Sequence, residues 1–241
     1  MKKKIILIAA LLMSFSSLSF AQKIKFDIDL TDKQMGSIEA KAIENVNQFN
    51  DYVSLIWAKP TEAQKRDMPA FRELKEHYVD RALDLFIAKG EDLYAYDTIE
   101  VRGNDGRYHR QLDSVFVREA AIMETTSLKN PSKKNRQTVK TYLNKAAGLL
   151  GQPSDTYTQV EVTSSEAYFS RKLRKTGDGL YEGTLTFSQW FRGYRDGKRV
   201  IYGDLTDKTI KVYVERQVIL GEEVWDVKLG DVEAGVPTRI K

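Results

Sequence analysis

Short turns rich in glycine and aspartate divide the C-terminal part of the chain into alternating segments. The turns are residues 176–179 (Thr-Gly-Asp-Gly) and 196–198 (Asp-Gly-Lys). The segments around them are 156–175, 179–194, 199–216 and, after a further break, about 222–232. Consecutive strands joined by such turns pair antiparallel. The sequence therefore predicts a meander of long strands after Ser154, against which any helices must pack.

Three helices are predicted before the meander. The first has Thr31 or Ser37 as its N-cap, and Pro60 ends it. Its apolar residues recur every three or four positions, which is typical of a helix with one buried face. They are Ile38, Ala42, Val46, Phe49, Val53, Ile56 and Trp57.

The second helix is predicted over about 61–89 and the third over about 139–150. Gly90 is a suitable C-cap for the second, and Pro69 is expected to break it, so that its ordered part begins just after that proline. Gly151 is expected to end the third. The buried face predicted for the second helix is Phe71, Leu74, Tyr78, Leu85 and Phe86.

Two stretches are harder to assign. Residues 94–123 are predicted to form a strand pair around a turn at 103–106, although 115–124 could be helical because Ala120 to Met123 do not alternate. Residues 127–138 are polar and basic, which predicts a loop leading into the third helix. Their lysines and arginine are interpreted as a solvated face rather than a ligand patch.

The element order over about residues 31–233 resembles that of the nuclear transport factor 2-like superfamily. The resemblance implies a single α+β domain: three main helices packed on a strongly bent antiparallel sheet, a cone-shaped fold. That superfamily includes isomerases, dehydratases, carrier-like pockets and structural assembly modules. Its enzymes place an Asp/His or Tyr/Asp set inside the cone, and we can assign no such set in this sequence. Residues 234–241 carry no pattern and are predicted to be a tail.

The first 21 residues have the three parts of an export signal. Lys2 to Lys4 form a positive start, an apolar stretch follows to Met13, and a small uncharged stretch ends at Ala21. Cleavage there would leave Gln22 as the mature terminus and 22–30 as an arm or short strand. The alternative is an uncleaved anchor, but the apolar stretch is shorter than the roughly 20 residues of a span. The expected location is the periplasm or exterior of a Gram-negative bacterium, with no stable membrane span after cleavage.

Composition excludes several classes of function. The formal charge is +4, and three of those positives lie in the leader, so the remainder carries 4 − 3 = +1. A nearly neutral chain gives no electrostatic case for a nucleic acid partner. The chain has no cysteine, which rules out disulfides and thiolate catalysis, and only two histidines. We therefore predict no metal site and no cofactor.

The ionisable candidates are given structural interpretations. His77 is expected to be a boundary residue of the second helix, and His109 an exposed turn residue, each without an evident carboxylate partner. Four aspartates lie near the ends of the last strands and are interpreted as turn residues rather than a cation or acid/base site. These aspartates are Asp204, Asp207, Asp226 and Asp231.

Segment 181–194 carries the predicted partner-binding residues. Because successive side chains of a strand point to opposite faces, Tyr181, Leu185, Phe187 and Phe191 share the core face. The other face ends in Trp190, Arg192 and Tyr194, which are residue types enriched at binding hot spots. Tyr202 and Tyr213 are expected as possible neighbours, depending on register. The alternative is an ordinary exposed face with cross-strand aromatic pairs.

Two functions follow from these patterns. The first is an exported, non-catalytic binding or assembly module of the cell envelope, which meets an envelope protein or a second copy through the Trp190 face. The second is a small-ligand pocket protein or enzyme that uses the interior of the cone. A cavity of a few hundred Å³ with converging polar groups would favour the second function, and a filled interior the first.

Overall fold

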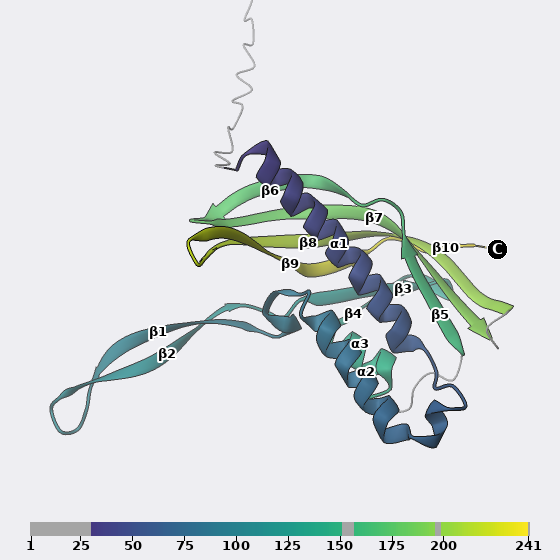
Figure 1. Ribbon diagram of the computed structural model, residues 1–241, viewed down its shortest axis with the longest axis horizontal. Coiled ribbons are helices and arrows are strands. Elements are labelled where there is room, and N and C mark those ends of the chain that lie inside the picture. Colours follow the sequence, from purple (N-terminus) through teal and green to yellow (C-terminus); the bar gives the residue numbers. More distant parts are fainter. Residues whose placement is uncertain (1–29, 151–156, 196–198, 241) are drawn as a thin grey trace, which may run out of the picture.

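The protein has an α+β architecture, seen in a computed structural model that describes residues 30–150, 157–195 and 199–240 (Figure 1). The helices are α1 (Asp32–Trp57), α2 (Met68–Leu83) and α3 (Val139–Ala147). The strands are β1 (Leu93–Arg102), β2 (Tyr108–Arg118), β3 (Ile122–Ser127), β4 (Asn130–Thr138), β5 (Gln159–Ser164), β6 (Tyr168–Gly177), β7 (Leu180–Arg195), β8 (Arg199–Ile219), β9 (Glu222–Ala234) and β10 (Thr238–Arg239).

The main sheet is open, with the strand order β4-β3-β9-β8-β7-β5. Strand β5 pairs with the C-terminal half of β7, and β6 pairs with its N-terminal half. The short strand β10 pairs with β8. The predicted antiparallel meander is confirmed for β6-β7-β8-β9. The segment 156–175, predicted as its first strand, instead contains two strands, β5 and β6, which both pair with β7. The sheet is nevertheless mixed, because β3 runs parallel to β9 at Met123 and Val232. The hairpin β3–β4 thereby covers an edge of β9 that would otherwise be exposed.

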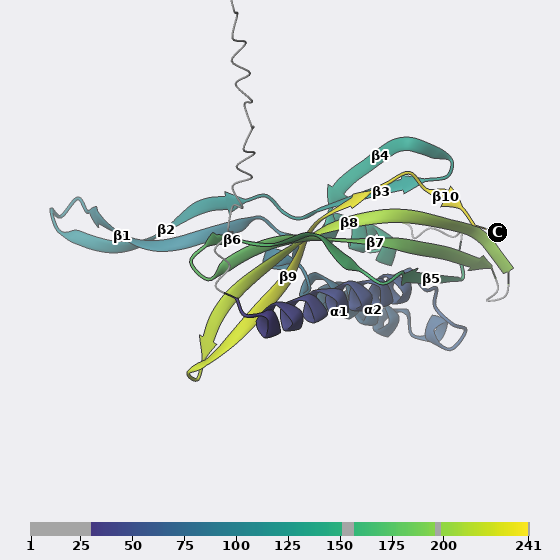
Figure 2. The same cartoon turned by 90° about the horizontal axis from the view of Figure 1, so that it is seen from above.

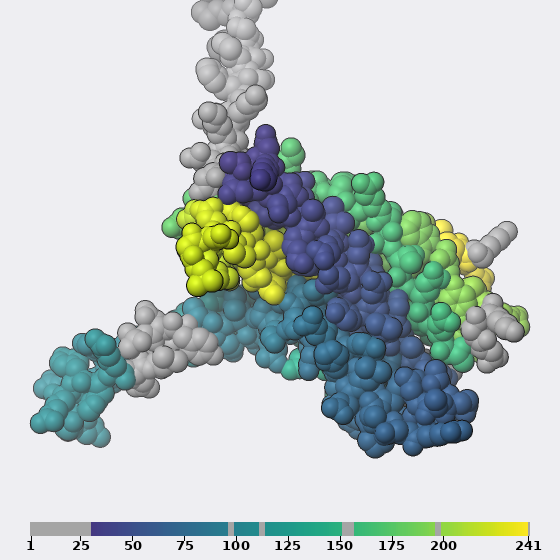
Figure 3. Space-filling model, viewed as in Figure 1, coloured from purple at the N-terminus to yellow at the C-terminus, as the bar shows by residue number. Residues whose placement is uncertain are grey.

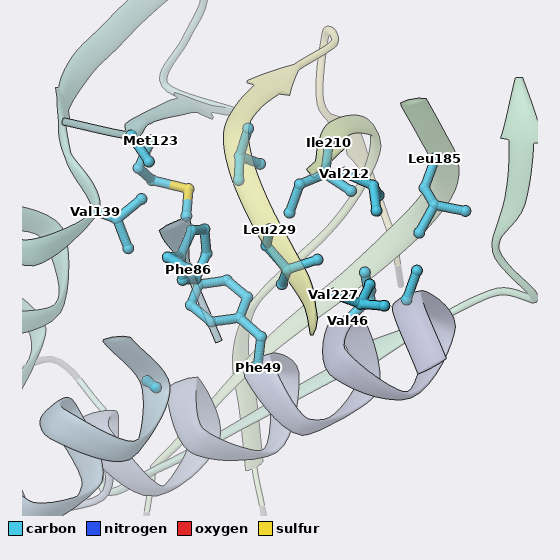
Figure 4. Packing of buried hydrophobic residues seen from close by; sticks show 14 of the residues in the cluster. Val46, Phe49, Phe86, Met123, Val139, Leu185, Ile210, Val212, Val227 and Leu229 are labelled. Carbon is cyan, nitrogen blue, oxygen red and sulfur yellow. The ribbon is translucent and has the colours of Figure 1, made fainter. Parts of the chain in front are cut away.

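Helix α1 lies across one face of this sheet, and the β8–β9 end of the sheet curves toward its N-terminus (Figure 2). Thr31 is its N-cap and forms a capping box with Gln34. The predicted stripe from Ile38 to Ile56 is buried. It packs on sheet residues of β7, β8 and β9, which Figure 4 shows with Phe49 and Phe86 at the centre. Those two rings meet edge to face with 5.0 Å between their centroids.

The predicted second helix is longer than the real one. Helix α2 begins after its N-cap Asp67, and Pro69 lies in its first turn, where a missing N–H costs no hydrogen bond. It ends at Leu83 because Phe86 leaves the helix axis and makes a β-bridge to Leu229 of the sheet. The prediction that Phe86 is buried is confirmed, but its helical assignment is wrong.

Three further assignments are corrected. Helix α3 ends at Ala147, with Gly148 at φ +76° as its left-handed C-cap; Gly151 lies outside the described residues. The predicted loop at 127–138 is largely strand β4. Its side chains are mostly exposed and many are charged, as on protected edge strands, so no alternation marks it in the sequence. The expected tail contains the short strand β10, which pairs with β8.

The predicted strand pair in 94–123 is confirmed, but it leaves the main sheet. Strands β1 and β2 form a separate two-stranded sheet that projects from the body as an arm (Figures 1 and 3). Several large apolar side chains of this arm are exposed. They are Tyr94, Ile99, Val101, Tyr108, Val115, Phe116 and Val117.

Lys75 of α2, which the sequence analysis overlooked, closes the C-terminal end of α1. Its side chain is only 3% exposed. Its Nζ donates hydrogen bonds to the carbonyl oxygens of Leu55, Ile56 and Ala58 at 2.8, 2.6 and 2.5 Å. The last carbonyls of a helix lack partners within the helix, and they attract a cation. Lys75 therefore joins α2 to α1 through backbone groups rather than through an ion pair.

We predict that Lys75→Met destabilises the fold by about 2–4 kcal/mol, because it leaves buried carbonyl groups without donors. Urea unfolding followed by circular dichroism measures this loss. Lys41→Met is the control, since Lys41 is half exposed on α1 and pairs with Glu44 at the surface. Equal effects of the two substitutions would contradict the proposed role of Lys75.

Candidate functional site

A cavity of about 650 Å³ lies between helices α1 and α3 and the covered face of the sheet. Its volume is within the range of small-molecule sites, roughly 300–1,000 Å³. Apolar walls come from α1, α3 and the strands β3, β5, β7, β8 and β9. These walls include Val46, Phe49, Val53, Met123, Ala146, Val162, Phe187, Ile210 and Val232.

One end of the cavity has an aromatic wall. Trp57 of α1 meets Tyr157 and Phe191 at ring-centroid distances of 6.3 and 6.2 Å. Tyr202 of β8 meets the same two rings at 6.2 and 5.9 Å. Three of these four contacts are edge to face, which suits the charge distribution of aromatic rings. The wall is therefore preorganised, with Trp57 held by the end of α1 that Lys75 caps.

A polar strip runs along the floor of the cavity on β8. Tyr202, Asp204, Thr206 and Lys208 alternate along the strand and line the cavity together. Register places Lys208 opposite Phe187 and Asp204 opposite Phe191 of β7. The strip thus lies on the same face of β8 as Ile210 and the core residues that follow it along the strand.

Asp204 is buried at 8% exposure, and both of its carboxylate oxygens accept hydrogen bonds. The Tyr202 hydroxyl donates to Oδ2 at 2.5 Å, and the Thr206 hydroxyl donates to Oδ1 at 3.2 Å. Burial, together with the hydrogen bond to Asp204, raises the pKa of Tyr202 well above its ordinary value. The tyrosine therefore stays a neutral donor to the carboxylate at physiological pH.

Lys208 is the most deeply buried cation on the cavity surface, at 6% exposure. Among the described residues, its Nζ donates one hydrogen bond, to the backbone oxygen of Glu124 at 3.3 Å. Burial lowers the pKa of Lys208 to about 8, although the charges of Asp204 and Glu124 oppose that shift. The hydrogen-bonding capacity of the ammonium is thus only partly used.

The Glu124 carboxylate is directed to other partners. Its Oε1 lies 2.7 Å from Lys134 Nζ and accepts from the Ala234 backbone N–H at 3.1 Å. Burial by itself would raise the pKa of Glu124, but these partners hold it below its ordinary value. Glu124 thus forms its ion pair with Lys134, while Lys208 receives only its backbone oxygen and the longer-range effect of its charge.

Two further buried donors lack hydrogen-bond partners among the described residues: Trp57 Nε1, on a lining residue, and Asn50 Nδ2, beside the cavity. The Trp57 indole lies near the Tyr142 hydroxyl and opposes the rise that burial causes in the pKa of Tyr142. Asn50 accepts from Gln189, a cavity residue, at 2.7 Å through its Oδ1. The unmet hydrogen-bonding capacity here is that of donors.

The predicted partner-binding residues lie on the opposite face of β7. The predicted core face is confirmed for Tyr181, Leu185 and Phe187. On the other face, Arg192 Nη1 lies 3.6 Å from Glu161 Oε2, and the Tyr194 hydroxyl donates to that oxygen at 2.5 Å. Trp190 is half-buried opposite Thr163 and Leu205. The three residues are neighbours, and their role in partner binding stays a prediction.

The expected aromatic neighbours of that face are only partly correct. Tyr202 lines the cavity and so lies on the other side of the sheet from Trp190. Tyr213 shares the outer face, but the Arg118 guanidinium stacks over its ring at 3.9 Å from the centroid. Tyr202 and Tyr213 are an odd number of positions apart on β8. The alternation of side chains along a strand therefore puts them on opposite faces of the sheet, whatever the register.

The interpretation of the four aspartates as turn residues is wrong for Asp204, which lies within β8 and faces the cavity. Asp207 accepts from the Ser188 hydroxyl at 2.7 Å, and Asp226 pairs with Lys228 at 3.5 Å. Asp231 Oδ2 accepts a hydrogen bond from Lys211 Nζ at 2.8 Å, and its Oδ1 accepts from the Ile122 backbone N–H at 3.0 Å. Each is thus used within the sheet rather than in a turn.

Both histidines lie outside the cavity. His77 is exposed on α2, as expected for a boundary residue. His109 is exposed on the arm, where its Nε2 lies 3.0 Å from Asp105 Oδ1. The expectation that His109 has no carboxylate partner is therefore wrong. Within residues 30–150, 157–195 and 199–240, no cluster of histidine and carboxylate side chains is arranged to hold a metal ion.

No family model matches the chain, and no curated protein is significantly similar to it in sequence. Across the described part of the chain, no helix combines the length and apolar character that crossing a membrane requires.

Because the pKa of Lys208 falls to about 8 on folding, the unfolded chain binds more protons than the native one between about pH 8 and pH 10.5. The unfavourable burial of the ammonium is present in full below pH 8 and is relieved as the pH rises through that window. We therefore predict that wild type gains stability relative to Lys208→Met as the pH rises. Urea unfolding of both proteins at several pH values measures the difference. A difference that stays constant with pH would contradict the assignment.

Proposed function

We propose that this protein is a non-catalytic binding protein that holds a small, largely apolar molecule in the cavity between α1, α3 and the sheet. The observation that carries the proposal is the cavity itself: about 650 Å³, walled by apolar and aromatic side chains, with a few polar groups on its floor. That combination is the usual form of a small-molecule site. A fully packed interior would have supported a purely structural module instead.

Binding is preferred over catalysis because of how the polar groups are engaged. Both oxygens of Asp204 accept from hydroxyls, and the two histidines lie elsewhere. The alternative is an isomerase- or dehydratase-like enzyme of the nuclear transport factor 2-like superfamily. The Tyr202–Asp204 pair and the helices on one face of the sheet support that alternative. The sheet is mixed, because β3 runs parallel to β9, whereas the resemblance implies an antiparallel sheet.

We predict that wild type binds the neutral apolar dye Nile red at one site, and that Ala146→Phe weakens this binding at least tenfold by filling the cavity. Ala146 of α3 is a lining residue with a small side chain. Ala70→Phe is the matched control, since Ala70 is exposed on α2. Fluorescence titration measures both, with circular dichroism to check the fold. Equal dye binding by the two variants would place the site elsewhere.

We also propose that the protein works outside the cytoplasm, in the periplasm or exterior of a Gram-negative bacterium. The composition of residues 1–21 supports this, and these residues lie outside the described structure. Expression of the full chain in such a host should yield a soluble envelope protein whose intact mass begins at Gln22. A mass that includes residues 1–21 would show that the leader is retained.

Assembly through the outer sheet face is a second proposed function. The cluster of Trp190, Arg192 and Tyr194 supports it, with an envelope protein or a second copy as the partner. The exposed apolar side chains of the β1–β2 arm add to the surface available for assembly. This function is compatible with ligand binding, because the two faces of the sheet are separate.

We predict that Trp190→Ala leaves the fold intact and weakens self-association or partner capture, since burying an aromatic side chain contributes roughly 1.5–3 kcal/mol. Sedimentation velocity of wild type and variant measures self-association. Tyr168→Ala is the control, because Tyr168 is an exposed aromatic residue on strand β6. A monomeric wild type whose Trp190→Ala variant captures partners equally well would refute the role of this face.

A further inference from the structure

The chemistry of the ligand can be read from the buried polar atoms that lack partners. At the cavity these atoms are donors: two of the three N–H groups of Lys208 and the Trp57 indole N–H. The unpaired Asn50 amide nitrogen lies beside the cavity, on a residue bonded to the lining residue Gln189. A buried donor without an acceptor is unfavourable by comparison with the same group in water. The site is therefore incomplete as a hydrogen-bonding environment, and a bound molecule that presents acceptors would complete it.

Two acceptors that line the cavity, Asp204 and Gln137, are already engaged. Asp204 accepts two hydroxyl hydrogen bonds, and Glu124 Oε1 is held by Lys134 and the Ala234 backbone. Gln137 accepts from Lys145 Nζ at 2.9 Å at the rim. A cationic ligand would therefore have to displace existing hydrogen bonds, whereas an anionic ligand would add to them.

The surroundings of Lys208 define the shape of the ligand. Lys208 has Phe187 opposite it on β7 and has Ile210 and Thr206 on either side along the same face, and the charges of Asp204, Glu124 and Lys134 act on its ammonium. Lys208 and Asp204 are four positions apart on β8, which is about 13 Å of strand. The aromatic wall of Trp57, Tyr157 and Phe191 lies near the Asp204 end. A charged head at Lys208 leaves that length for a tail, which would lie between the polar strip of β8 and the apolar lining residues of α1.

We propose that the ligand is an amphipathic monocarboxylate whose carboxylate accepts hydrogen bonds from Lys208 and whose apolar tail runs along the cavity toward the aromatic wall. This inference rests on the proposed function as a small-ligand binding protein. A carboxylate provides several lone pairs for the unused donors, and a charge-assisted hydrogen bond is about twice as strong as a neutral one. Lys208 is then the residue that selects an acid over a neutral molecule of the same length.

Isothermal titration calorimetry with decanoate, decanol and decylamine tests the proposal, since the three probes share one tail and differ in head group. For wild type we expect decanoate to bind at least tenfold more tightly than decanol, and decylamine to bind most weakly. For Lys208→Met we expect decanoate to fall to the level of decanol while decanol changes little. Replacing a buried charge with an apolar side chain of similar size is often tolerated by the fold, and Nile red binding provides the check.

Lys140→Met is the matched control, because Lys140 is an exposed lysine of α3 that does not line the cavity. It should change decanoate affinity by less than about threefold, as expected for a screened surface charge. If decanol and decanoate bind equally, or if decylamine binds best, the monocarboxylate assignment is overturned while the binding function stands. If none of the three probes binds and Nile red does not bind either, both proposals fail.

Discussion

Two charged side chains, Asp204 and Lys208, are buried on the same face of β8 as the core residues Ile210 and Val212, and the architecture of the site depends on this. Removing ions from water is costly unless hydrogen bonds replace those lost. Asp204 is compensated by two hydroxyl groups from its own strand. Lys208 is compensated only in part, by one backbone carbonyl. A sheet face that must bury an incompletely satisfied ammonium cannot be closed by apolar packing alone.

The helices pack directly on one half of the sheet face, and the cavity separates them from the other half. Where β8 carries Ile210, Val212 and Val214, the stripe of α1 packs directly on the sheet. Where β8 carries the polar strip, the cavity separates the helices from the sheet. Lys75 fixes the end of α1 that bears Trp57, so the aromatic wall is held by the same contacts that join α1 to α2. Fold stability and site geometry are therefore linked through one helix terminus.

Strong periodicity made part of this structure predictable. The stripe of α1, the alternation of β7 and the order of the meander all depend on apolar residues at regular spacing, and each is confirmed. Edge strand β4 has no such spacing, because most of its side chains are exposed, and it was predicted as a loop. The length of α2 was overestimated because Leu85 and Phe86 continue its apolar pattern beyond the point where the backbone turns to the sheet.

The cavity residues were missed for a related reason. Tyr202, Asp204, Thr206 and Lys208 alternate as the solvent face of a strand would, so polarity alone indicated the wrong side. The sequence does indicate the correct side, because residues two positions apart on a strand share a face. Ile210, Val212 and Val214 continue the alternation of these four residues and belong to the core. Following that series back along β8 places Asp204 and Lys208 inside. The volume of the cavity and the partners of Glu124 depend on tertiary packing and could not be read from the chain.

Methyl NMR of the protein during titration with decanoate tests the central claim most directly, because it locates the ligand without any substitution. The account predicts that the largest chemical-shift changes occur at methyl groups that line the cavity, which belong to Val46, Val53, Val162, Ile210 and Val232. Methyl groups of the exposed residues Val115, Val117 and Val218 serve as internal references. Changes confined to those exposed positions, or no changes at saturating decanoate, would contradict the claim that the cavity under α1 and α3 is the functional site.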